Sequence, residues 1–168
     1  MSTQIECHTE ATRRLVMRLI VPSPVDRVWQ AWTDPGEAGM WFAAAARIVP
    51  ERGEPYELFW QPDSPDHEST IGCRVTAVSP LRYLSFTWRG PDVLGPIMNE
   101  GDPPPPPTNV TVCFSPHPAE TAIEVVHSGF RQGNGWDQAI SWHERAWNTC
   151  LGNLSAYLAG DPLPRPWS

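Results

Sequence analysis

Alternating apolar and polar positions predict that much of the chain before residue 129 folds as strands. In residues 13–21, apolar side chains fall on one side of an extended segment, and Arg14 and Arg18 fall on the other. The same period of two recurs in residues 44–49, 56–61, 69–78, 83–89, 109–115 and 121–128. Because short turns join most of these segments, we expect an antiparallel meander of about seven strands.

One face of this predicted sheet is apolar and unusually rich in aromatic rings. Its inward-facing positions are Tyr56, Leu58, Trp60, Leu84, Phe86, Trp88, Val110, Val112, Phe114, Ile123, Val125 and His127. A face of this kind has to be covered by another layer of the fold.

A long amphipathic helix is predicted from about Trp136 to Leu158. Its apolar residues recur at steps of three and four along one stripe that comprises Ile140, His143, Trp147, Leu151, Leu154 and Leu158. The only extensive apolar surface on which it can lie is the concave face of the sheet, and Gly160 then ends it. The predicted fold is therefore α+β, a curved sheet that grips a helix.

Two short helices are predicted directly after the first strand. Ser23 and Pro24 supply a cap and a proline at the first helical position, which opens a helix through Trp32. Asp34 and Pro35 repeat this arrangement for a second helix that ends near residues 41–42.

The length of 168 residues fits one domain, which we place at residues 13–160. We expect residues 1–12 to be a flexible N-terminus and residues 161–168 to be a flexible C-terminal tail. Residues 90–107 form a proline-rich loop insertion, with five consecutive prolines at 103–107.

Charge and composition exclude several classes of function. Nineteen acidic residues against 12 basic ones give a formal charge of −7, so we expect no nucleic-acid partner. All basic residues are arginine, which excludes Schiff-base chemistry and a phosphate-binding lysine. No segment is long and apolar enough to span a bilayer, and the first residues have no apolar signal core, so we expect no membrane partner and a cytoplasmic location.

The sequence shows no pattern that fixes a metal, a cofactor or a catalytic residue. Four cysteines at 7, 73, 113 and 150 lie far apart, and we favour free thiols over disulfides. A nucleophile elbow, a glycine-rich phosphate loop and a metal-binding histidine box are all missing.

Nine tryptophans give the chain an aromatic surplus that either lines a ligand site or packs the core. For Trp29, Trp32 and Trp41 we favour packing, whereas for Trp60, Trp88 and Trp147 both interpretations remain open. The candidate ligand-binding residues are Trp60, Phe86, Trp88, Phe114, His127, Phe130, Trp136, His143 and Trp147.

His127 and His143 are the candidates for proton chemistry, because periodicity places both toward the space between helix and sheet. An apolar wall would keep both rings neutral, and either could anchor a ligand by one hydrogen bond. The alternative, which we favour, is a pair of core histidines whose nitrogens are satisfied within the protein. Asp137 and Glu144 lie off the apolar stripe and are interpreted as solvated charges.

Several local segments, taken in this order, resemble the START-like superfamily SRPBCC and, within it, the family of the activators of the heat-shock-protein-90 ATPase (AHSA type). These segments are Val28 to Pro35, Met40 to Phe42, Gly72 to Pro80, Leu84 to Trp88, Val110 to Phe114, Val126 to Phe130 and His143 to Trp147. The resemblance is close to full length. Ala146 stands where the family pattern usually has glycine.

The resemblance implies a helix-grip fold with a cavity between the long helix and the sheet, which the superfamily uses for apolar small molecules. It does not imply one activity. Activation of a chaperone ATPase is not expected, because the eukaryotic activators carry an additional N-terminal domain for which 168 residues leave no room.

In related folds the connection that contains the insertion stands at the cavity mouth. We weigh a stiff lid against a solvated hairpin held extended by its prolines, and we favour the hairpin.

Three functional hypotheses follow. The first is a non-catalytic domain that binds a small apolar or aromatic molecule. The second is a cyclase or hydratase that uses one cavity histidine as general acid or base. The third is a chaperone-associated protein, or one that sequesters a toxic product, with a protein partner at the proline-rich loop.

Overall fold

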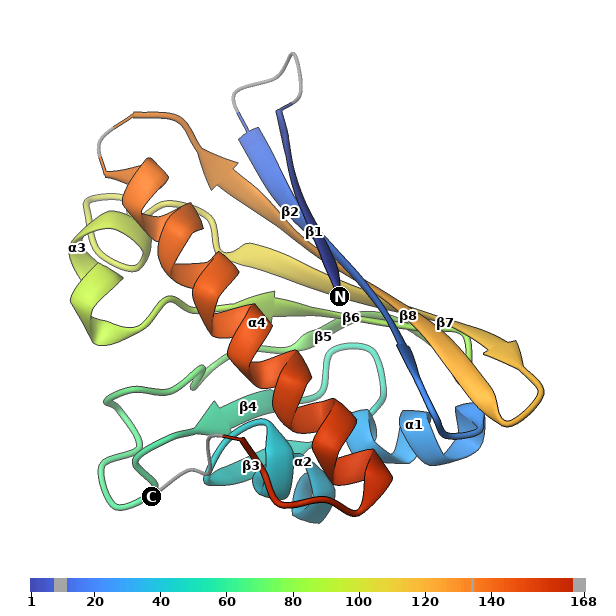
Figure 1. Ribbon diagram of the computed structural model, residues 1–168. Coiled ribbons are helices and arrows are strands. Elements are labelled where there is room, and N and C mark those ends of the chain that lie inside the picture. The colour runs from blue at the N-terminus through green and yellow to red at the C-terminus, as the bar shows by residue number, and fades with distance from the viewer. Residues whose placement is uncertain (8–11, 134, 165–168) are drawn as a thin grey trace.

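The computed structural model describes residues 1–7, 12–133 and 135–164. A six-stranded antiparallel sheet curves around one long helix, and a small hairpin and two short helices close one end (Figure 1). The strands of the large sheet, in spatial order, are β1 (Ser2–Cys7), β2 (Thr12–Val21), β8 (Glu120–Arg131), β7 (Thr108–His117), β6 (Tyr83–Trp88) and β5 (Val75–Ser79). The hairpin consists of β3 (Ala45–Ile48) and β4 (Tyr56–Phe59).

The helices are α1 (Val25–Thr33), α2 (Pro35–Trp41), the 3₁₀ turn η1 (Asp92–Leu94), α3 (Gly95–Met98) and α4 (Trp136–Ala159). Helix α4 lies along the concave side of the sheet (Figure 1), and the predicted α+β helix-grip fold is therefore confirmed. The C-cap of α4 is Gly160, which has a positive φ of 76°. The N–H of Gly160 donates to the carbonyl groups of Ala156 and Tyr157.

The sheet is not the single meander that the alternation predicts. Strand β2 pairs with β8, the last strand, along its full length from Thr12 to Val21. Helices α1 and α2 carry the chain away from β2, so that β3 and β4 form their own sheet. Isolated bridges, Pro55 with Arg74 and Phe59 with Ser69, connect this hairpin to the segment before β5.

The predicted flexible N-terminus is wrong for residues 2–7, which form β1 on the edge of the sheet. Each of these residues pairs with β2, from Ser2 opposite Arg18 to Cys7 opposite Arg13. Polar side chains reinforce this pairing, because Arg14 bonds Glu6 at 2.5 Å. Residues 8–11 of the predicted N-terminus, and residues 165–168 of the predicted tail, lie outside the described residues.

The faces predicted from alternation are the buried ones. Leu84, Phe86 and Trp88 on β6 are buried, as are the inward positions of β7 and β8, whereas Trp60 is half-buried. On α4, the predicted stripe from Ile140 to Leu154 is buried. Among the described cysteine side chains, Cys73, Cys113 and Cys150 are free thiols.

Only one of the two predicted helix caps forms. The Asp34 side chain accepts from the N–H of Glu37 at 3.0 Å, with Pro35 at the start of α2. Ser23 does not cap α1; Pro24 is the N-cap. The carbonyl of Ser23 instead accepts a hydrogen bond from Thr121 on β8, which holds it in the turn after β2.

The insertion is a solvated segment only in its second half. Residues 92–98 form η1 and α3, and Leu94 and Met98 are buried in the core. The Asn99 side chain closes this segment by bonding both the N–H and the carbonyl of Gly90, at 3.0 and 2.8 Å. Residues 103–107 follow as mostly exposed chain, so the favoured solvated hairpin is wrong for residues 92–98.

Candidate ligand-binding site

A cleft of about 660 Å³ opens between α4, the loop that joins β4 to β5, and the end of β6. Its lining from the sheet side and the short helices comprises Phe42, Trp60, Gln61, Glu68, Ser69, Trp88, Arg89 and Pro91. Its lining from α4 comprises Trp142, His143, Arg145, Ala146, Trp147, Thr149 and Cys150. Five of the lining side chains are phenylalanine or tryptophan. The charged side chains in the lining are Glu68, Arg89 and Arg145.

Helix α4 uses two adjacent stripes for two purposes. The buried stripe through Ile140, His143 and Trp147 packs on the sheet. A second stripe, displaced by about one residue, carries Trp142, Ala146 and Thr149 to the cleft. Residues at steps of three and four share a helix face, so both stripes follow from the same helical period.

Aromatic rings form the inner wall of the cleft. The rings of Trp88 and Trp147 lie 5.6 Å apart, and Phe42 is 6.2 Å from Trp88 and 5.7 Å from Trp147. Trp60 meets Trp88 edge to face at 6.1 Å. Such a wall can hold a flat ligand by dispersion and by offset or edge contacts.

The two buried histidines hold the two indoles of this wall. Trp88 Nε1 donates to His143 Nε2 at 3.1 Å, and His143 Nδ1 donates to the carbonyl of Ala139 at 2.8 Å. Trp147 Nε1 donates to His127 Nδ1 at 3.0 Å, and His127 Nε2 donates to Thr108 Oγ1 at 2.8 Å. An indole N–H can only donate, so each histidine is a neutral ring with its proton on the other nitrogen.

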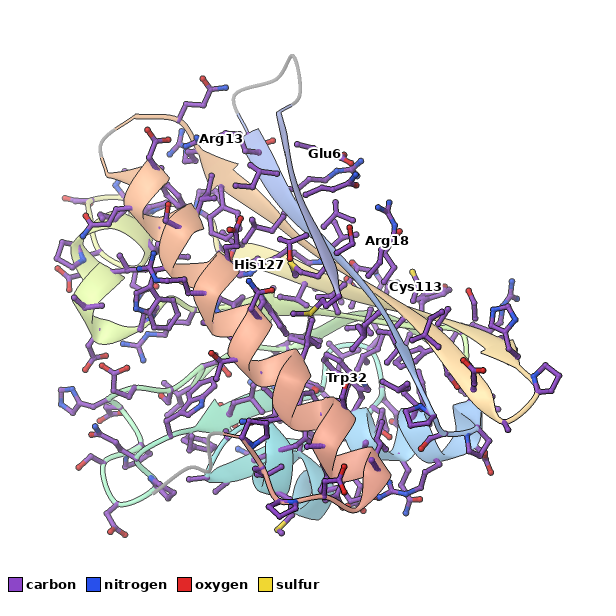
Figure 2. All side chains as sticks on the ribbon, viewed as in Figure 1. Glu6, Arg13, Arg18, Trp32, Cys113 and His127 are labelled. Atoms are coloured by element: carbon purple, nitrogen blue, oxygen red, sulfur yellow. The ribbon has the colours of Figure 1, made fainter. Side chains whose placement is uncertain are left out.

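Burial keeps both rings neutral well below physiological pH. It lowers the pKa of His143 to about 4, and it lowers the pKa of His127 well below its ordinary value, with a further contribution from His143. The two ring centroids are 5.0 Å apart, and His127 lies behind α4 on the side of the sheet (Figure 2). All four ring nitrogens are occupied within the protein, so neither ring presents a nitrogen for proton transfer to a ligand.

Two loops at the mouth of the cleft are tied to each other. The carboxylate of Asp92 in η1 accepts from His67 Nδ1 at 2.8 Å and from the N–H of Glu68 at 3.3 Å. The hydrogen bond from His67 lowers the pKa of Asp92. Arg89 donates to the carbonyl of Asp66 at 3.2 Å. Glu68 has a φ of 45°, a conformation uncommon outside glycine that often occurs at functional loops.

The structure separates the nine candidate residues into two groups. Trp60, Trp88, His143 and Trp147 line the cleft. Those outside its lining are buried in the core and are Phe86, Phe114, His127, Phe130 and Trp136. Phe86 stacks on Tyr56 at 3.8 Å, which illustrates the packing role of this group.

Lining residues that are not among the candidates predicted from the sequence include Phe42, Arg89, Trp142 and Arg145. For Trp142 and Arg145 a signal exists, because they stand one residue before the selected His143 and one before Ala146 on the same helix. Asp137, expected to be solvated, is exposed and bonds Arg13 at 2.5 Å, which joins the start of α4 to β2 (Figure 2 labels Arg13).

One thiol lies in the lining of the cleft. Cys150 lines the cleft, but burial raises the pKa of its thiol well above its ordinary value, so it is not a thiolate nucleophile. Over the residues that the structure describes, no group of three or more histidine, cysteine or acidic side chains is placed to hold a metal ion. No helix within those residues is long and apolar enough to cross a membrane.

Comparison with solved structures finds the same fold. Protein MLL2253 from Mesorhizobium loti has a TM-score of 0.69 at 22% identity over 90% of this chain and 100% of its own. CalU16 from Micromonospora echinospora has a TM-score of 0.66 at 21% identity over 98% and 88%. The Aha1 dimer from Colwellia psychrerythraea has a TM-score of 0.64 at 14% identity over 86% and 95%. A search of curated proteins found no significant match.

A family model gives the sequence-level relationship. It matches residues 22–159, which run from the turn after β2 to the last residue of α4 and include every residue that lines the cleft. The chain therefore belongs to the family described as Activator of Hsp90 ATPase homolog 1-like protein, as its motifs predict.

Proposed function

We propose that this protein binds a small apolar or aromatic molecule in the cleft beside α4 and does not transform it. The observation that carries the proposal is the aromatic inner wall, whose indoles Trp88 and Trp147 are held in place by buried histidines. The volume of about 660 Å³ is within the usual range for small-molecule sites, about 300–1,000 Å³. We further propose that it acts in the cytoplasm, without a nucleic-acid or membrane partner.

Proton transfer by a cavity histidine is not part of this proposal. A general acid or base needs a nitrogen within hydrogen-bonding reach of the ligand. His143 borders the cleft, but Trp88 and Ala139 occupy its two nitrogens, and His127 lies outside the lining. A cyclase or hydratase of the expected type would therefore have to break a core hydrogen bond first.

A protein partner at residues 103–107 stays a prediction. These prolines are mostly exposed. Chaperone assistance and sequestration of a toxic product are roles that a binding cleft would permit, but no contact of the described residues favours either.

A variant that fills the cleft tests the proposal. Ala146 lies in its lining, so Ala146→Trp places an indole where the ligand would sit. Tryptophan fluorescence and melting temperature are measured against a panel of flat aromatic, polyketide-like and lipid molecules, because a ligand of the native state raises its apparent stability. We expect a saturable response that Ala146→Trp reduces at least about tenfold, as loss of about 1.4 kcal/mol of binding would.

The matched control is Ala159→Trp, which adds the same side chain at an exposed position at the end of α4. Its response should equal that of the unmodified protein. If no molecule of the panel shifts either signal, or if Ala146→Trp responds like Ala159→Trp, the cleft is not the binding site and the proposal is wrong.

A further inference from the structure

We propose that the ligand is amphipathic, with an aromatic body against the inner wall and one anionic group at the mouth of the cleft, held by Arg145. This inference rests on the proposed function and names the chemical class that the same site selects. Three features carry it: two central indoles whose N–H groups are already bonded within the protein, a guanidinium outside the ion pairs of the described residues, and the placement of charge along the cleft.

The inner wall offers its ligand ring surfaces rather than hydrogen bonds. The indole N–H groups of Trp88 and Trp147 are directed to His143 and His127, away from any ligand in the cleft. The histidine nitrogens are occupied in turn. A polar ligand group placed against this wall would lose its hydration without a partner, at a cost that excludes it. The inner part of the ligand must therefore be apolar or aromatic.

Polar and charged side chains gather elsewhere in the lining. Gln61, Glu68 and Ser69 come from the loop between β4 and β5, and Arg89 follows the end of β6. Arg145 comes from the opposite side, on α4. The polar end of a ligand would therefore lie against these side chains. Its apolar end would lie against the aromatic wall.

Arg145 is the cation best placed to take an anionic group. On α4 the positions three and four residues away are Ser141, Trp142, Asn148 and Thr149, so no carboxylate is spaced to pair with it. The ion pairs among the described residues do not include it. Arg89, in contrast, already donates to the carbonyl of Asp66.

The charges of the cleft favour an anion over a cation. Two arginines and one glutamate line it, a local excess of positive charge in a chain whose formal charge is −7. Arg145 is exposed, so its attraction to an anionic group is that of a partly solvated charge pair, strengthened by charge-assisted hydrogen bonds. Glu68 is the one carboxylate in the lining, and it would repel a second anionic group on the ligand. We therefore expect the ligand to carry a single anionic group.

A pair of probes that differ in one charged group tests this class. 8-Anilinonaphthalene-1-sulfonate carries an aromatic body and one sulfonate, and N-phenyl-1-naphthylamine has the same ring system without it. We expect the sulfonate probe to bind with the lower Kd. Arg145→Gln should raise that Kd by about three- to tenfold, as expected for a partly solvated charge pair, and leave the Kd of the neutral probe unchanged.

Two further variants sharpen the result. Glu68→Gln removes the opposing carboxylate and should lower the Kd of the sulfonate probe by about two- to threefold. Arg52→Gln removes the same charge as Arg145→Gln from the exposed turn between β3 and β4, outside the lining, and should change neither Kd. If Ala146→Trp raises the Kd of both probes, both bind in the cleft.

The outcomes separate the two proposals. If both probes bind in the cleft with equal affinity, or if Arg145→Gln acts no differently from Arg52→Gln, the anionic class is wrong and the binding function stands. Tighter binding of thioflavin T, a cationic aromatic probe, than of the sulfonate probe also overturns the anionic class. If Ala146→Trp leaves the binding of every probe unchanged, the cleft is not a binding site and both proposals fall.

Discussion

His127 and His143 act in this protein as positioning residues for two tryptophans. Each ring accepts a hydrogen bond from one indole N–H and donates one from its own N–H, His127 to Thr108 and His143 to the carbonyl of Ala139. Buried hydrogen bonds of this kind fix orientation, because leaving one unmade costs about 1–3 kcal/mol. The same contacts that remove the histidines from acid–base chemistry therefore define the shape of the cleft wall.

Stability should fall as the pH drops from about 6.5 to about 4. The unfolded chain takes up protons at His127 and His143 near pH 6.5, whereas burial holds the pKa of His143 at about 4 in the folded state. Since the unfolded state binds more protons in this window, the free energy of unfolding decreases with falling pH, by about 3 kcal/mol for His143 and further for His127. Urea unfolding at several pH values measures this slope.

Replacement of the imidazoles provides the control for that slope. In His143→Gln the side chain can still accept from Trp88, and it does not titrate, so the variant should be less stable at pH 7 and lose less stability on acidification. Asp92 does not confuse the result, because its lowered pKa places its contribution below pH 3.8. An unchanged slope in the His127→Asn, His143→Gln double variant would show that other groups cause the acid sensitivity.

Among the secondary-structure elements, the insertion between β6 and β7 is the one whose role differs most from its composition. Glycine and proline suggest a loop, but Leu94 and Met98 bury themselves in the core, and Ile97 fills the space above Gly135 at the start of α4. Pro91, at its beginning, borders the cleft. Its fixed shape therefore supports one rim of the candidate site.

Asn99→Ala should loosen this element. The variant leaves the N–H and carbonyl of buried Gly90 without their partners, and it should lower the free energy of unfolding by about 1–3 kcal/mol. Native-state hydrogen exchange should show faster exchange in residues 90–99. Val93→Ala, at an exposed site in η1, is the control and should change stability by less than about 0.5 kcal/mol. Equal effects of both variants would refute the role of Asn99.

Sequence periodicity predicts best the elements that bury one face against the rest of the fold. The strands β6 to β8 and helix α4 each have one buried face, and their apolar spacing shows it. Strand β1 lacks that signal, because its sequence STQIEC is polar and its stability comes from pairing with β2. Burial of residues 92–98 is likewise a tertiary effect.

Prediction of the site was limited by the same principle. Periodicity selects the most apolar face of a strand or helix, which is the core, and so the candidates included the buried Phe114 on β7 and Trp136 on α4 along with residues that line the cleft. A cleft is bordered by the stripe next to the core. Trp142 and Arg145 stand beside the core stripe in the sequence, but only the arrangement of α4 against the neighbouring loops shows that this side of the helix borders the cleft.

At the scale of the whole molecule, the cleft results from how the long helix is supported. Helix α4 packs on β2 and β8 of the sheet and on α2 and α3 at its sides. On its remaining side it faces the loop that leads from β4 to β5, and the cleft lies there. Strand β1 lies at the opposite edge of the sheet from β5 (Figure 1), and its Thr3 hydroxyl donates to Asn148 of α4, a residue outside the cleft lining.

A chain that begins at Thr12 should therefore fold and keep the cleft. The core cluster contains no residue of β1, whose ladder hydrogen bonds, at about 1 kcal/mol each, are largely offset by the ordering of its backbone at about 1–2 kcal/mol per residue. We expect the free energy of unfolding to fall by less than about 3 kcal/mol, as measured by urea unfolding followed by circular dichroism.

The new edge, β2, carries Arg14 and Arg18, and such charges resist edge-to-edge association. Size-exclusion chromatography should accordingly show no new aggregate, and the Kd of the sulfonate probe should match that of the full chain. If the truncated chain folds but no longer binds the probe, β1 shapes the cleft from the far edge of the sheet. If the truncated chain does not fold, β1 belongs to the cooperative core.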